Sequence, residues 1–95
     1  MEFISLERSP RKNKRFVFEY KDGDKIKKIH FGYENGSTYI DNKDITKRKN
    51  YLARHRVRED WNVINPASLS RWLLWDTTSL KENLENYLDK FKIKY

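Results

Sequence analysis

The sequence predicts an α+β fold in which a three-stranded antiparallel β-meander packs against two or three α-helices. Two short runs rich in aromatic and β-branched residues, 15–20 and 25–31, flank an Asp-Gly turn signal. Two later segments, 44–59 and 79–91, carry apolar residues at helical spacing. The 95 residues include three Trp, six Tyr and five Phe, so one domain can build a core although 37% of the residues are charged.

The predicted sheet starts with a hairpin. Asp22-Gly23 is a favoured type I′ turn pair, because both central residues of that turn need positive φ. Pairing across this turn places Tyr20 opposite Lys25. One sheet face then carries apolar side chains that other elements must bury: Phe16, Phe18, Ile29 and Phe31.

A second turn signal, Asn35-Gly36, pairs Phe31 with Ile40 and predicts the third strand of the meander. Residues 1–7 could add an edge strand.

The basic segment RSPRKNKR at 8–15 has no large apolar residue and is typical of a flexible arm. The expected organisation is therefore an N-terminal segment, 1–15, followed by a single domain, 16–95.

The second half should supply the helices that cover the sheet. Asp41 or Asn42 can cap a helix from about Asp44 to Glu59. One face of this helix comprises Ile45, Arg48, Tyr51, Leu52, His55 and Glu59. A narrow stripe beside that face comprises Lys47, Arg54 and Arg58.

Two further helices follow. Asn65 as N-cap and Pro66 at the first helical position open a short helix that is apolar almost all round, which predicts central burial or a shared interface. Ser79 and Glu82 form a capping-box pattern ahead of an amphipathic helix. Its apolar face comprises Leu80, Leu84, Tyr87, Leu88 and Phe91. The terminal KIKY could form a short strand.

The sequence lacks the residues that several kinds of catalytic or metal-binding site require. The absence of cysteine excludes disulfides, thiolate zinc sites and cysteine nucleophiles. The three glycines form neither a phosphate-binding loop nor a nucleophile elbow. His55 and Glu59 have the i, i+4 spacing of a metal pair, but zinc needs three or four ligands, and Arg54 and Arg58 would repel a cation. We therefore expect no enzyme, no cofactor, no metal and no small-molecule substrate. His55 is expected to be half-buried and hydrogen-bonded to Glu59 or to the sheet, in a structural role.

The net charge of +7 comes from two blocks. Residues 8–15 hold five bases and no acid, and residues 44–58 hold six bases and one acid. Clustered positive charge is typical of polyanion binders, although short charge runs also occur as ordinary solvated faces. The interpretation preferred here is nucleic-acid binding through the backbone with little sequence preference, DNA being favoured over RNA. The predicted contacts are Lys47, Arg54, Arg58, Arg71, Arg8, Arg11, Lys12, Lys14 and Arg15, with Tyr33 and Tyr39 on the outer sheet face available to stack on bases.

The alternative is an oligomeric protein–protein interaction module. Leu74 and Trp75 on the all-round apolar helix would then mediate self-association, in a virion component or a binder of host proteins such as chromatin components. Structural roles are expected for Arg48, Tyr51, His55, Glu59, Trp61, Trp72 and Trp75. Arg48 should form an internal ion pair with Glu59 or another acid. No secretory signal or membrane-length apolar run is found, so an intracellular protein without a membrane partner is expected.

Several blocks together resemble a family of small uncharacterised proteins encoded by nucleocytoplasmic large DNA viruses. These blocks are Phe31-Gly32, Tyr39 with Asp41, RKNYLARH (48–55), Glu59-Asp60-Trp61, SLSRWLLW (68–75) and YLDKFKI (87–93). The resemblance covers roughly residues 16–93 and departs from the pattern at Pro66-Ala67, where an Ala-Gly pair is expected. It implies a viral protein of the host cytoplasm, nucleus or virion, for which genome packaging or handling is one expected role, and it implies no particular activity.

Overall fold

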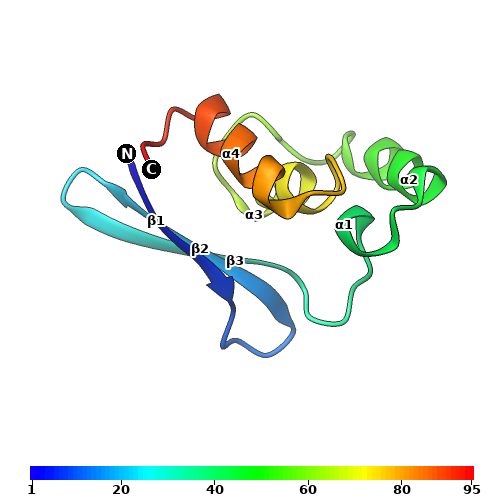
Figure 1. Ribbon diagram of the computed structural model, residues 1–95, viewed down its shortest axis with the longest axis horizontal. Coiled ribbons are helices and arrows are strands. Elements are labelled where there is room, and N and C mark those ends of the chain that lie inside the picture. The colour runs from blue at the N-terminus through cyan, green and yellow to red at the C-terminus, as the bar shows by residue number, and fades with distance from the viewer.

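The computed structural model describes residues 1–95 as a three-stranded antiparallel sheet with helices on one side of it (Figure 1). The strands follow the order β1-β2-β3 and comprise β1 (Glu2–Arg8), β2 (Lys14–Asp22) and β3 (Lys25–Tyr33). The helical elements are α1 (Tyr39–Asn42), α2 (Ile45–His55), α3 (Pro66–Leu69), the π-helical turn η1 (Ser70–Leu74) and α4 (Leu80–Lys90). The predicted α+β class with a three-stranded antiparallel sheet is confirmed.

The β2–β3 hairpin forms where the Asp-Gly signal predicts it, but its register differs. Asp22 pairs with Lys25, and Tyr20 lies opposite Lys27 instead of Lys25. Gly23 has a φ of +62°, whereas Asp24 is not among the residues with positive φ. Positive φ at the first central position alone is the requirement of a type II′ turn, which replaces the predicted type I′ turn. The register moves by an even number of residues, so the predicted apolar face is preserved.

The predicted third strand around Ile40 is wrong, because residues 39–42 form α1. Thr38 and Asp41 form a reciprocal capping box there, which favours a helical turn. The third strand is β1, whose residue Phe3 lies opposite Tyr20 of β2. The edge strand suggested for residues 1–7 therefore completes the sheet.

The segment 8–15 is not a separate arm, and the predicted boundary after residue 15 is wrong. Arg8 ends β1, Lys14 begins β2, and the turn between them carries its own hydrogen bonds. The Ser9 hydroxyl lies 2.6 Å from His30 Nδ1 of β3, and the backbone N–H of Ser9 donates to the Arg15 carbonyl. The first basic block is thus part of the sheet.

The core lies between the sheet and the helices that follow it. Phe18 and Phe31 project from β2 and β3 and are at most 1% exposed. From the helices, Leu69, Leu73 and Tyr87 are equally buried. The short apolar helix is therefore central, which is one of the two outcomes predicted for it, and α4 contributes its apolar face.

The chain ends lie side by side next to β1 (Figure 1). The backbone N–H of Phe3 donates to the Lys94 carbonyl, and Glu2 and Lys94 form an isolated parallel bridge. The short strand suggested for KIKY is thus a single bridge. None of the helices combines the length and apolarity that crossing a membrane would require.

Candidate nucleic-acid interface

Helix α2 and the turn after it set the geometry of the site. Asp44 caps α2, in place of the predicted Asp41 or Asn42, by accepting hydrogen bonds from two first-turn N–H groups. The helix ends at His55 and not at Glu59. The backbone N–H groups of Arg58 and Glu59 both donate to the His55 carbonyl, each at 3.1 Å. This tight turn returns Glu59 to the side of His55. Arg58 follows the end of α2 and does not belong to the helix, but it lines one hollow together with Arg54.

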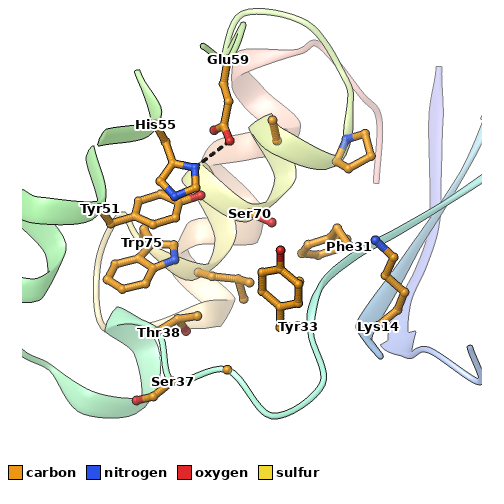
Figure 2. Close-up of a pocket in the computed structure, with 15 residues that line it drawn as sticks. Lys14, Phe31, Tyr33, Ser37, Thr38, Tyr51, His55, Glu59, Ser70 and Trp75 are labelled. Carbon is orange, nitrogen blue, oxygen red and sulfur yellow. Dashed lines mark hydrogen bonds and ion pairs between the residues drawn. The ribbon is translucent and has the colours of Figure 1, made fainter. Parts of the chain in front are cut away.

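His55 and Glu59 form the predicted hydrogen bond, with 2.7 Å between Nδ1 and Oε2 (Figure 2). The other carboxylate oxygen of Glu59 accepts from Trp61 Nε1 at 2.8 Å. Both oxygens of Glu59 are therefore engaged. Because a carboxylate only accepts, the His55 proton lies on Nδ1 in the neutral ring, and Nε2 is left for another partner.

Three aromatic rings stack beside this pair. The His55 ring lies 4.1 Å from the Tyr51 ring, and the Tyr51 ring lies 4.3 Å from the Trp75 ring. Figure 2 shows the three rings one above another along one wall of a cleft. Burial raises the pKa of Tyr51, and the charge of Glu59 acts in the same direction, so the hydroxyl stays protonated at neutral pH.

The cleft has a volume of about 410 Å³ and lies between α2, the end of β3 and the α3–η1 segment. Phe31 and Tyr33 of β3 face the aromatic stack, and Lys14 of β2 stands at the far rim (Figure 2). Tyr33 is 81% exposed. This volume falls within the range of about 300–1,000 Å³ typical of sites for small organic groups.

Besides Lys14 Nζ and the exposed Tyr33 hydroxyl, four polar side-chain atoms of the cleft residues make no hydrogen bond within the protein. The only side-chain nitrogen or oxygen that is both buried and unpartnered is Arg71 Nε, so these four reach accessible space. They are the Tyr51 hydroxyl, His55 Nε2, the Ser70 hydroxyl and Trp75 Nε1. The cleft therefore offers both donors and acceptors.

Two basic hollows adjoin the cleft and share lining residues with it. One, of about 570 Å³, contains Arg54 and Arg58 and shares Tyr33 with the cleft. The other, of about 510 Å³, contains Arg8 and shares Lys14. We call the cleft and these two hollows together the groove. The two basic blocks of the sequence thus lie at opposite ends of one aromatic-lined depression.

The electrostatics of the groove favour an anion. Among its acids, Asp41 is paired with Arg15 through two contacts of 2.6 Å, Glu59 is engaged as described above, and Glu34 accepts a hydrogen bond from the backbone N–H of Asn13. The hydrogen bond from Arg15 holds the pKa of Asp41 well below its usual range. Partial burial, followed by the charge of Arg11 and other nearby cations, lowers the pKa of His30. Arg11 and Lys14 of the first basic block thus add to the effect of burial in disfavouring the charged form of His30.

Two of the residues predicted to contact nucleic acid, Arg71 and Arg15, are bound to other side chains of the protein. Arg71 is only 9% exposed; its guanidinium lies over the rings of Trp61 and Trp72 and donates to Asp76. Arg15 is committed to Asp41. Both residues, expected as phosphate ligands, instead hold elements together. The remaining predicted cations have exposed side chains: Arg8, Arg11, Lys12, Lys14, Lys47, Arg54 and Arg58.

The structural prediction for Arg48 is confirmed, with Asp76 as its acid. Arg48 Nε donates to the carbonyls of Trp75 and Asp76 at 2.8 and 2.9 Å, and its guanidinium lies 3.6 Å from the Asp76 carboxylate. The Arg48 guanidinium also sits over the Tyr39 ring. Tyr39 therefore belongs to α1 and not to an outer sheet face, which corrects its predicted stacking role.

The predicted self-association surface is used within the chain. Leu74 is 1% exposed and belongs to the core, and the Trp75 ring is covered by Tyr51. An all-round apolar helix can be buried by its own domain, which is the case here.

The sequence does not predict the groove, because Tyr51 and His55 are expected only to pack and Trp75 is expected to pack or to mediate self-association. The i, i+4 spacing of Tyr51 and His55 indicates a shared helix face, but nothing local indicates that Trp75 and Phe31 meet it. Ser70 carried no signal at all.

The fold and the groove together define a small α+β protein with a basic groove around an aromatic cleft. Residues 4–55 match the model of a family described as a family of unknown function (DUF5754), and the chain belongs to that family. The match spans nearly the whole sheet, α1 and α2. No curated protein and no solved structure matches the chain.

Proposed function

We propose that this protein binds nucleic acid in the groove, as a non-enzymatic protein with little sequence preference. The observation that carries the proposal is the convergence of the two basic blocks at opposite ends of the aromatic cleft. Cations on either side of a concave surface are suited to a polyanion that crosses it.

The cations proposed as phosphate ligands are those whose charge is not already used. Arg8, Lys14, Arg54 and Arg58 form no ion pair within the protein. Of the groove acids, Asp41 pairs with Arg15 and Glu59 bonds to His55, whereas Glu34 accepts only from the backbone N–H of Asn13. Lys47, seven residues before Arg54 on α2, shares a helix face with Arg54 but lines none of the three depressions. Because these contacts reach phosphates and not base edges, they carry no sequence information.

The proposed biological setting is a large DNA virus. It is supported by the resemblance carried by the RKNYLARH and SRWLLW blocks. In that setting the ligand would be DNA in preference to RNA, and the role would be genome packaging or handling in the host cytoplasm, nucleus or virion.

The test is fluorescence anisotropy of labelled oligonucleotides over a salt series. With about four phosphates contacted, log K should fall against log salt with a slope of roughly −3 to −4. The variant Arg54→Glu/Arg58→Glu should bind at least about tenfold more weakly at low salt and show a shallower slope.

The matched control is Lys21→Glu/Lys25→Glu, which changes the net charge equally at the tip of the β2–β3 hairpin, far from α2 (Figure 1). Circular dichroism would confirm that both variants fold. Equal losses in both variants would show that net charge alone drives binding, and the groove would then not be the site.

A further inference from the structure

We infer that the cleft receives an unpaired base, so that the ligand of the groove is single-stranded nucleic acid and not duplex. This inference rests on the proposed function and specifies its substrate class. It depends on three features of the cleft: an exposed stacking ring, unpartnered polar atoms, and cations on both sides.

The stacking ring is Tyr33. It is 81% exposed although it lines the cleft, and Figure 2 draws it between the Tyr51–Trp75 stack and Phe31. An aromatic ring at the mouth of a concave site can stack on any base, because every base has a π-face. A base in a duplex cannot enter such a site without leaving its pair.

The unpartnered polar atoms suit the edge of a base. Glu59 fixes Nδ1 of His55, so Nε2 is the ring nitrogen that remains available in the cleft. The hydroxyls of Tyr51 and Ser70 can each donate or accept. Such a set can bond to the edges of different bases, which agrees with binding that has little sequence preference.

The cations fix the path of the backbone. A strand with one base in the cleft would meet Arg54 and Arg58 on one side and Lys14 and Arg8 on the other. A rigid duplex would contact the raised rims of the groove but could not place a base against Tyr33. Charge complementarity and ring stacking therefore select the same occupant.

The experiment compares a thymidine 12-mer with an abasic 12-mer of equal phosphate count, a matched duplex, and free thymidine monophosphate as competitor. The wild-type protein should bind the thymidine strand about 5- to 150-fold more tightly than the abasic strand. Tyr33→Ala should lower the affinity for the thymidine strand about tenfold and leave the affinity for the abasic strand unchanged.

Two further variants sharpen the test. Tyr95→Ala removes another exposed tyrosine away from the cleft and should change nothing. Ala67→Leu adds bulk to the α3 side of the cleft. It should weaken binding of the thymidine strand and leave binding of the abasic strand unchanged. Circular dichroism would check the fold of each variant.

Equal affinity for the thymidine and abasic strands, or no loss in Tyr33→Ala, would overturn the inference. If Arg54→Glu/Arg58→Glu still weakened oligonucleotide binding, nucleic-acid binding in the groove would remain the proposed function, but the base-binding inference would be lost. Competition by thymidine monophosphate at concentrations close to those of the strand would instead indicate a mononucleotide site and also overturn it. Absence of binding to every oligonucleotide would overturn both proposals.

Discussion

Tyr51 of α2 and Trp75, which follows η1, lie face to face with ring centroids 4.3 Å apart and planes inclined by 5°. This contact joins α2, which adds little to the core, to the element that lies at its centre. It also forms the wall of the cleft, so stability and site geometry depend on the same pair of rings.

The first prediction concerns this stack. Tyr51→Ala should lower the free energy of unfolding by about 3 kcal/mol, because a buried ring and its stacking contact are lost together. Tyr51→Phe keeps both rings and should change stability by less than about 1 kcal/mol. Chemical denaturation of both variants would measure this, and equal losses would show that the hydroxyl and not the stack is responsible.

The second prediction concerns Asn83, which is fully buried in α4. Its Nδ2 donates to the carbonyls of Leu73 and Thr77, and its Oδ1 accepts from the N–H and hydroxyl of Thr77. Asn83→Asp should destabilise the protein by about 3 kcal/mol at neutral pH, because a carboxylate would face two carbonyl oxygens. The loss, measured by chemical denaturation, should be smaller at pH 4, where protonation restores one donor. The exposed neighbour change Asn86→Asp is the control and should have little effect.

The third prediction concerns acid stability. Because the pKa of Asp41 is depressed in the folded state, its pair with Arg15 contributes stability that is fully present above the ordinary aspartate pKa of about 4. That contribution is lost as the pH falls further towards the folded-state value. Asp41→Asn should cost about 1 kcal/mol at pH 7, and the difference from wild type should shrink below pH 4.

The matched control for Asp41→Asn is Asp24→Asn, at the exposed hairpin tip. Thermal unfolding measured from about pH 7 to about pH 2.5 should show no pH-dependent difference between Asp24→Asn and wild type. A constant deficit for Asp41→Asn across this range would rule out the ion pair as its cause.

The fourth prediction compares two glycines with similar positive φ. A Cβ on Gly23 would meet no atom within 4 Å, whereas a Cβ on Gly32 would lie 3.2 Å from Arg15 Cβ and 3.2 Å from Leu74 Cδ1. Gly23→Ala should cost only about 1 kcal/mol, for the strained backbone conformation alone. Gly32→Ala should cost about 1–2 kcal/mol more, because two packed side chains must move. Equal costs in denaturant melts would show that β3 relaxes away from η1 freely.

The sequence predicts the local elements of this protein well. The N-caps at Asn65 and Ser79, the amphipathic 80–91 helix and the hairpin around Gly23 all form where their signals lie. Each of these signals depends on residues within a few positions of one another, and their hydrogen bonds or apolar periodicity follow directly from the order of residues along the chain.

The candidate site could be predicted only in part. The two basic blocks follow from the sequence, and Glu59 is one of the two partners that it predicts for His55. The uses of individual cations do not follow from it. Arg15 lies 26 residues from Asp41, and nothing local distinguishes it from Lys14, which remains exposed at the rim. Arg71 is of a residue type usually found at the surface, yet two tryptophan rings cover it.

The order of residues along the chain was enough to predict the α+β class and the excess of positive charge in two blocks, and it left the apolar helix either central or at a shared interface. Three features could be seen only in the folded chain: which segment forms the third strand, which arginines form internal ion pairs, and that the two basic blocks adjoin one cleft. The physical reason is range: caps and periodicity act within one or two helical turns, whereas strand choice and ion pairing depend on free-energy differences between segments far apart in the chain.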